Sequence, residues 1–118
     1  MGKVDLDATF LALADGNRRA VIDLLRKQPR RAGEIAAVLE LTPPALSRHL
    51  RVLRRSGLIH QKGLEQDARV RIYHLQKKPF DQLRGWLEEV ETFWAGELAA
   101  FSDHVERSKV RGKGSPKR

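Results

Sequence analysis

The chain has 118 residues, 41% hydrophobic and 32% charged, which fits one globular domain with a small core. It has no cysteine, which excludes disulfides and thiolate metal sites, and no apolar run of the ~20 residues that a membrane span needs. Its net charge of +8 favours a polyanionic partner such as nucleic acid, although on charge alone a merely basic protein is an equal alternative. The N-terminus lacks a signal-peptide pattern, which predicts a cytoplasmic protein.

Apolar residues at helical spacing predict three short helices in the first third of the chain. The first is predicted over about 5–14. Asp15 is a candidate N-cap for a second helix over about 17–27, which ends before Pro29. The third is predicted over about 32–40. The inward positions predicted for the second and third helices are Val21, Leu24, Leu25, Ile35, Ala36 and Leu39.

A fourth helix is predicted over about 43–56, because clear start and stop signals bracket it. Thr42 can accept a hydrogen bond from a first-turn amide, and Pro43 suits the first helical position, where its missing N–H is no loss. Gly57 is the expected C-terminal stop. The predicted buried stripe of this helix consists of Leu46, Leu50 and Leu53.

The spacing of apolar residues then changes from helical to roughly alternating. Two strands are predicted over 58–61 and 69–75, joined by a polar tip over 62–68. In the second strand the predicted apolar members are Val70, Ile72 and, less regularly, Tyr73 and Leu75. The side chains predicted to point the other way are Arg69, Arg71 and His74. The pattern therefore predicts a β-hairpin with a basic face.

A long helix is predicted over 79–107, where apolar residues step by three and four. At ~1.5 Å per residue it is about 43 Å long, more than so small a domain can cover. Pairing with a second copy of the chain explains the stripe, and the alternative is that the first helix folds over it within one monomer. The predicted dimer interface consists of Leu6, Phe10, Leu83, Leu87, Val90, Trp94, Leu98 and Phe101. A basic, disordered tail is predicted over 108–118, after a single domain over 1–107.

The positive charge is concentrated in the middle of the chain. Residues 42–78 contain nine basic and two acidic residues, a net charge of +7. Residues 79–107 contain two basic and seven acidic residues, a net charge of −5. The predicted fourth helix and hairpin therefore carry the polyanion-binding surface, and the long helix does not.

The order of helices followed by a hairpin predicts a winged helix-turn-helix, a mostly α fold with a small β-hairpin (α+β). In this fold the second helix of the pair enters the major groove of DNA and reads bases near its N-terminus. Arg48 suits bidentate binding to guanine, whereas Arg51, Arg54 and Arg55 suit phosphates. The arginines of the hairpin suit phosphates or the minor groove, and a merely solvated basic face is the alternative. The predicted DNA-binding residues are Thr42, Pro43, Pro44, Ser47, Arg48, His49, Arg51, Arg55, Arg69 and Arg71.

Three segments resemble the ArsR family of bacterial repressors: 12–19 (Ala-Leu-Ala-Asp-Gly-Asn-Arg-Arg), 32–36 (Ala-Gly-Glu-Ile-Ala) and 41–59. The most specific part is the Ser-Arg-His-Leu-x-x-Leu-x-x-x-Gly-Leu run within the third segment. The resemblance extends over 6–105, and Trp86-Leu87 and Phe93-Trp94 are similar to an autorepressor-like subgroup without metal ligands. It implies a homodimer, formed through the first and last helices, that binds an inverted repeat at a promoter. Where an effector exists, the resemblance implies that the effector releases the DNA.

The sequence departs from the family pattern at its metal sites and at two helix starts. Family metal sensors carry cysteines where this chain has Arg30-Arg31-Ala32-Gly33, and the last helix offers one histidine, His104, without the family's Asp-x-His pair. No metal site is therefore predicted. Arg31 replaces the Ser or Thr that often caps the third helix, and Pro43 replaces a glutamine common at the start of the recognition helix. The base preference of the family therefore does not carry over.

No nucleophile with a base, phosphate-cradling glycine loop or paired-carboxylate site is recognisable, so neither catalysis nor a cofactor is predicted. The favoured function is a sequence-specific dimeric repressor that acts on the bacterial nucleoid. The alternatives are a basic architectural protein that binds DNA without sequence specificity and a winged-helix module that binds proteins. The predicted partners are double-stranded DNA, a second copy of the chain and, where one exists, a small-molecule effector at the aromatic-lined last helix.

Overall fold

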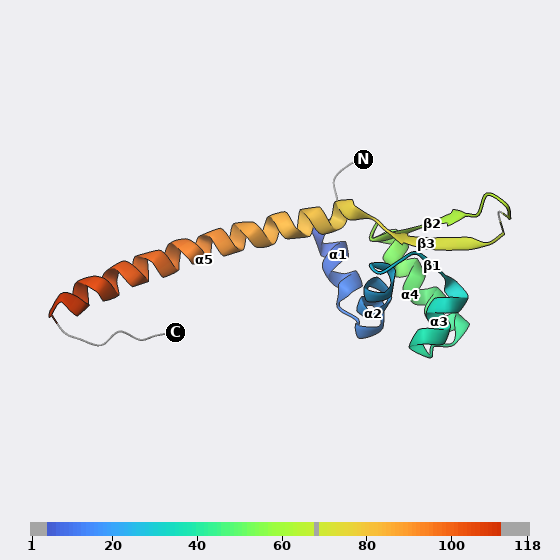
Figure 1. Cartoon of the computed structure of the whole chain (residues 1–118), viewed down its shortest axis with the longest axis horizontal. Coiled ribbons are helices and arrows are strands. Elements are labelled where there is room, and N and C mark those ends of the chain that lie inside the picture. Colours follow the sequence, from blue (N-terminus) through green and yellow to red (C-terminus); the bar gives the residue numbers. More distant parts are fainter. Residues whose placement is uncertain (1–4, 68, 112–118) are drawn as a thin grey trace. The chain divides into compact units, whose positions relative to one another are not determined.

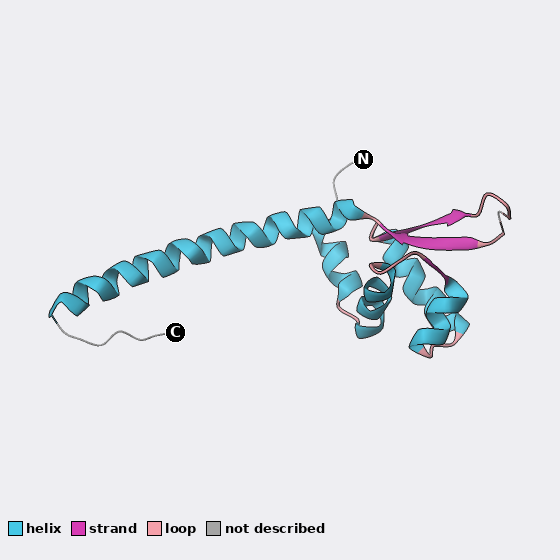
Figure 2. Ribbon diagram, viewed as in Figure 1, coloured by secondary structure: helices cyan, strands magenta, loops and turns pink. Residues whose placement is uncertain are grey.

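The structure is a computed structural model that describes residues 5–67 and 69–111 (Figures 1 and 2). Five helices and three short strands follow one another in these residues. They are α1 (Leu6–Leu13), α2 (Gly16–Leu25), β1 (Arg30–Arg31), α3 (Ala32–Leu39), α4 (Pro43–Arg55), β2 (Ile59–Gly63), β3 (Arg71–Leu75) and α5 (Lys77–Arg111). The chain divides within α5, between Leu83 and Arg84, into two compact units.

Side-chain caps define where the first helices begin. An oxygen of Asp5 accepts hydrogen bonds from two amides in the first turn of α1. The Asp15 carboxylate does the same at the start of α2, where the amides of Asn17 and Arg18 lie 2.8 and 3.2 Å away. These amide hydrogen bonds, that of Arg18 above all, hold the pKa of the Asp15 carboxyl below its ordinary value. The capping role predicted for Asp15 is confirmed.

Helix α3 begins without the side-chain cap that Ser or Thr supplies. Its N-cap residue, Arg31, makes no side-chain capping hydrogen bond. The Glu34 carboxylate instead reaches back and accepts a hydrogen bond from the Arg31 amide at 3.0 Å. The helix ends at Leu39, and its C-cap residue, Glu40, has a left-handed backbone with φ of 57°.

The strands form one antiparallel sheet in the order β1-β3-β2. Ile59 pairs with Leu75 and Gly63 with Arg71, so β2 and β3 make the predicted hairpin. The strand β1 was not predicted, because two arginines carry no alternating apolar pattern. It forms through backbone pairing of Arg30 with Tyr73, which only the folded chain brings together.

Residues 5–83 enclose a single apolar core. Helices α1 to α4 each contribute to it, and the sheet closes it. The buried members are Ala12, Val21, Ile22, Leu25, Ile35, Leu46, Leu50, Leu53, Leu58, Ile59 and Tyr73. The prediction for α2 missed Ile22, which is buried, while Leu24, predicted to face inward, is half-buried and packs against the core.

Helix α5 is longer than predicted at both ends. It begins at Lys77, two residues before Pro79. A proline is tolerated in the first turn of a helix because the amide hydrogen that it lacks would have no helical partner there. It continues to Arg111, so 108–111 are helical, and the rest of the predicted tail, 112–118, lies outside the described residues. None of the helices in the described ranges is both long and apolar enough to cross a lipid bilayer.

Candidate nucleic-acid interface

Helix α4 packs against the core through one apolar face. Leu46, Leu50 and Leu53 are each at most 3% exposed, so the stripe predicted for this helix is confirmed. Because these residues are spaced by four and three, they lie on one side of the helix and fix its rotation. Burial of this stripe therefore decides which α4 side chains face outward.

The outward face of α4 is basic. Ser47, Arg48, Arg51 and Arg55 are all exposed, and the three arginines recur at intervals of three and four. No acidic residue lies within α4. The helix thus presents a row of fixed positive charges directly opposite its leucines.

The start of α4 has the predicted cap. The Thr42 hydroxyl accepts a hydrogen bond from the Ala45 amide at 3.3 Å, and Pro43 occupies the first helical position. Thr42, Pro43 and Pro44 are exposed. Gly57 ends this part of the chain with φ of 82°, as the stop signal predicted. The first turn of α4 is therefore both capped and exposed to solvent.

The hairpin of β2 and β3 forms the wing, and alternation along β3 assigns its faces. Tyr73 is 8% exposed and faces the core, so Arg71, two residues earlier, lies on the same face of the strand. Ile72 and His74 lie on the other face, which corrects the predicted grouping of His74 with Arg71. The prediction failed because apolar residues occupy consecutive positions in this strand, which leaves the period ambiguous.

Arg69 lies outside the strand, since β3 begins at Arg71 rather than at residue 69. Its guanidinium donates two hydrogen bonds to the Asp67 carboxylate, at 3.0 and 3.2 Å. The Arg69 side chain, followed by its amide, holds the pKa of Asp67 below its ordinary value. The two wing arginines therefore differ, because Arg71 belongs to the sheet while Arg69 is paired with a carboxylate at the tip.

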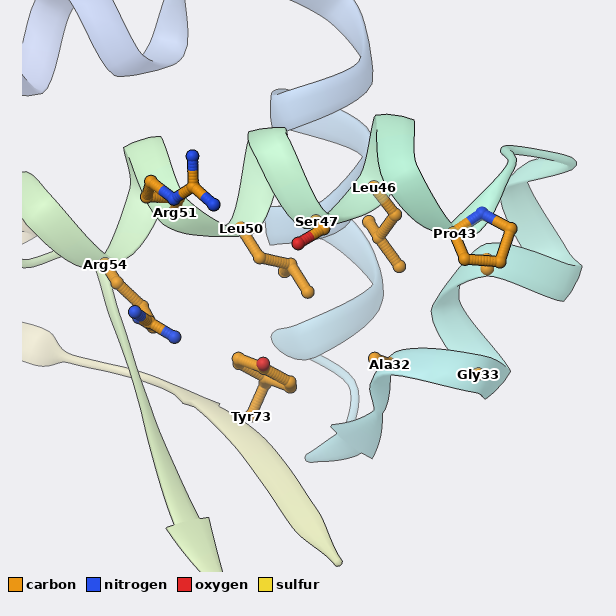
Figure 3. A pocket seen from close by; sticks show the side chains of 10 residues that line it. Ala32, Gly33, Pro43, Leu46, Ser47, Leu50, Arg51, Arg54 and Tyr73 are labelled. Atoms are coloured by element: carbon orange, nitrogen blue, oxygen red, sulfur yellow. The ribbon is translucent and has the colours of Figure 1, made fainter.

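A cavity of about 220 Å³ lies beside α4 on the side of the wing (Figure 3). The side chains of Leu46 and Leu50 and the ring of Tyr73 line its apolar part, and the Ala32-Gly33 start of α3 closes one end. Ser47, Arg51 and Arg54 lie along the α4 side, with Arg54 directed toward Tyr73 (Figure 3). The structure thus brings Ser47, Arg51 and Arg54 of α4 together with Tyr73, which the sequence did not single out as part of the site.

His49 lies at the opposite edge of α4 and is half-buried. Its Nδ1 atom is 3.4 Å from a guanidinium nitrogen of Arg18, which stands 31 residues earlier in the chain. The Ala-Asp-Gly-Asn-Arg-Arg segment contained Arg18, but no local pattern shows which residue a long side chain reaches. Arg18 was therefore missed as a neighbour of the recognition helix.

His60 and His74 are directly opposite each other on β2 and β3, with ring centroids 5.1 Å apart and nearly parallel. Partial burial, followed by the charges of His60 and Lys62, lowers the pKa of His74 below its ordinary value of 6.5. Within the described ranges, no three His, Cys, Asp or Glu side chains gather as metal ligands.

The residues predicted for a dimer interface carry much exposed apolar surface. Phe10 is 43% exposed, while Leu6, Leu83 and Val90 are half-buried. Leu87, Trp94, Leu98 and Phe101 are between 45% and 64% exposed. Trp86 and Phe93 add further exposed aromatic surface to the same helix. Such a stripe on an isolated chain is a candidate contact surface for another apolar face.

Comparison with known proteins shows similarity over the same region. Residues 15–61 match the family described as bacterial regulatory protein, arsR family. The chain is 31% identical over 100 residues to the HTH-type transcriptional regulator Rv2034 of Mycobacterium tuberculosis, covering 85% of this chain and 88% of that protein. It is 35% identical over 60 residues to the transcriptional repressor SdpR of Bacillus subtilis, covering 49% of this chain and 67% of that one.

Solved structures agree with these matches. The crystal structure of an ArsR family transcriptional regulator superposes with a TM-score of 0.68 at 33% identity, covering 76% of this chain and 96% of that chain. An ArsR-like transcriptional regulator from Rhodococcus sp. RHA1 superposes with a TM-score of 0.69 at 23% identity, covering 85% and 92%. The predicted winged helix-turn-helix is thereby confirmed.

Proposed function

The chain belongs to the ArsR family of bacterial regulatory proteins and is a DNA-binding transcriptional regulator, and from this premise we propose that it is a homodimeric repressor of an inverted-repeat operator. A relative that carries the name of a transcriptional repressor supports the direction of regulation. The proposed site of action is promoter DNA on the nucleoid of a bacterial cytoplasm. We propose no catalysis and no cofactor for it.

One observation carries the proposal, namely the opposition of buried leucines and exposed arginines on α4. The leucines fix the rotation of the helix, so its arginines face outward together with its capped first turn. A helix presented in this way fits the major groove, where residues of the first turns reach base edges. We assign Arg48 to a guanine, because its guanidinium fork matches the O6 and N7 acceptors of that base.

The remaining basic residues suit the DNA backbone. Arg51, Arg54 and Arg55 lie further along α4 and suit phosphate oxygens, which position the protein without reading sequence. Arg71 lies on the wing face that also carries Tyr73, and it suits the phosphates or the minor groove beside the helix. The Asp67 partner of Arg69 weakens the case for that residue, because a DNA contact there competes with an existing ion pair.

Dimerisation is proposed through α1 and α5. The apolar residues of α5 continue in steps of three and four over several turns, and pairing with a second copy removes them from water. A two-fold dimer presents two α4 helices, which suits half-sites about 34–36 Å apart on one face of DNA. That symmetry is the reason for proposing an inverted repeat.

The test compares specific with random DNA. Fluorescence anisotropy on DNA from upstream of the protein's own gene, against scrambled DNA at ~0.15 M salt, is expected to show at least ~1,000-fold preference with two protomers per site. Equal and steeply salt-dependent binding to both would favour an architectural protein or an operator elsewhere in the genome. No binding to either DNA would favour a protein-interaction module.

A further inference from the structure

The side chain of Arg18 joins three helices. Its Nε atom donates a hydrogen bond to the Ala12 carbonyl at 2.6 Å, and Nη2 donates to the Leu11 carbonyl at 3.1 Å, so the guanidinium caps the C-terminal end of α1. Its Nη1 atom lies 3.4 Å from Nδ1 of His49 in α4. The side chain is only 17% exposed, so these contacts form in a largely desolvated space.

The position of the guanidinium is itself fixed. Asp15, the N-cap of α2, places Oδ2 3.9 Å from Nη1 of Arg18. Because the pKa of Asp15 is lowered, its carboxylate is charged at neutral pH and attracts the guanidinium. Arg18 is thus held between a carboxylate of α2 and two carbonyls of α1 before it reaches α4.

The chemistry of the pair determines where His49 carries its proton. A guanidinium has N–H donors and no acceptor, so the facing Nδ1 atom must offer a lone pair. A proton on Nδ1 would place two donors against each other. The neutral ring therefore carries its proton on Nε2, and this atom becomes a hydrogen-bond donor.

The donor that results is open to solvent. In the part of the chain that the structure describes, His60 Nδ1 is the only buried side-chain nitrogen or oxygen without a partner. His49 Nε2 has no protein partner there either, so it keeps access to solvent. His49 stands next to Arg48 at the edge between the buried and the basic faces of α4, where the DNA backbone would pass.

We propose that Arg18 is a positioning residue for DNA binding, which holds His49 as an Nε2–H donor to a DNA phosphate and links that contact to the end of α1. The inference rests on the proposed function, because it assumes that α4 lies in the major groove. It makes the phosphate contact depend on α1, the helix that carries the proposed interface residues Leu6 and Phe10.

The first test needs no DNA. Long-range proton–nitrogen correlation NMR on the full chain at about pH 7.5 distinguishes the two histidine tautomers. His49 is expected as the Nε2–H form alone, and Arg18→Gln is expected to convert it to a mixture. Arg19→Gln is the matched control, because Arg19 also donates to a carbonyl of the last α1 turn, that of Leu13 at 2.7 Å. An Nδ1–H form in the wild type, or no change in Arg18→Gln, would overturn the proposal.

The second test measures affinity for a short duplex of random sequence at ~0.05 M salt, since a phosphate contact is independent of sequence. Arg18→Gln is expected to weaken binding about 10-fold, and Arg19→Gln by less than about 2-fold. In a His49→Phe background, Arg18→Gln is expected to have no further effect. The same loss in that background would mean that Arg18 acts on the fold alone, which would overturn its positioning role.

Two substitutions at His49 keep the test valid if Arg18→Gln does not fold. The amide of Gln places an N–H donor near the position of Nε2, whereas that of Asn places it near Nδ1. His49→Gln is therefore expected to keep wild-type affinity, and His49→Asn to lose about 10-fold. Equal affinities for the two variants would contradict the proposal. If the wild type shows no operator preference, the repressor proposal fails, while the tautomer and random-DNA results still decide the role of Arg18.

Discussion

Helices α4 and α5 carry apolar residues at the same spacing, yet their stripes lie in opposite environments. The leucines of α4 are at most 3% exposed, whereas Trp94, Leu98 and Phe101 of α5 are 57% to 64% exposed. The period of a stripe thus shows that a helix has an apolar face and does not establish what covers that face. For α4 the partner is the core of residues 5–83, and for α5 we propose a second copy of the chain.

The charges exposed on the two helices support the different tasks that we propose for them. α4 exposes arginines, while α5 exposes Glu88, Glu89 and Glu91 beside its apolar stripe. A row of carboxylates is repelled by DNA, so α5 is poorly suited to touch the duplex. One helix is therefore suited to a polyanion and the other to a protein surface, although both look alike by hydrophobic period.

Truncating one leucine in each helix gives the sharpest contrast. Leu53→Ala is expected to lower the free energy of unfolding by about 2–5 kcal/mol, because it leaves a cavity in a closely packed core. Leu98→Ala is expected to cost less than about 1 kcal/mol in the same measurement on protein diluted until it is monomeric, because this side chain is 64% exposed in a single chain. Urea denaturation followed by circular dichroism, at one protein concentration for both variants, measures the two values. Equal losses would mean that α5 is as much a part of the folding core as α4.

A charge in the α5 stripe tests the proposed dimer. Leu98→Asp is expected to halve the mass seen by sedimentation and to weaken operator binding about 100-fold, because a carboxylate loses its water against the partner's stripe. The helical circular dichroism signal of the whole chain is expected to persist, because residues 5–83 fold around their own core. Glu88→Gln, a change on the face of α5 that points away from the stripe, is the control and is expected to remain dimeric. A wild-type monomer would contradict the interface.

The sequence predicted α4 well because its signals are local. A cap at Thr42, a proline at the first position, leucines at steps of four and three and a glycine stop all act within one helix. The wing was predicted less well, because the facing of Tyr73 depends on a partner strand and a core that lie elsewhere in the chain. The Arg18–His49 contact, with its separation of 31 residues, has no local signal at all.

Two arginines of α4 are expected to differ in their role, Arg48 in sequence specificity and Arg55 in overall affinity for the DNA backbone. Arg48→Ala is expected to cost about 1–3 kcal/mol on the operator and much less on random DNA, so the specificity ratio falls. Arg55→Ala is expected to weaken binding to both DNAs alike and to reduce the slope of log affinity against log salt by about 1. Anisotropy titrations at several salt concentrations measure both quantities. If Arg55→Ala changes specificity and Arg48→Ala does not, the assignment of bases to the first turns of α4 is wrong.

The smallest expected effect is a pH dependence of stability. It comes from His74 in β3, which belongs to the same unit as α4. Partial burial, followed by the charges of His60 and Lys62, lowers the pKa of His74 below 6.5. Just below pH 6.5 the unfolded chain therefore binds a proton at this residue that the folded chain does not, so stability falls as the pH decreases through that window. Thermal unfolding between about pH 7.5 and pH 5 is expected to show this loss, and His74→Gln is expected to reduce it. His60→Gln is expected to give an intermediate slope, because it removes one cause of the shift and leaves the burial. A slope unchanged in His74→Gln would assign the pH dependence to other groups and leave the wing insensitive to protonation.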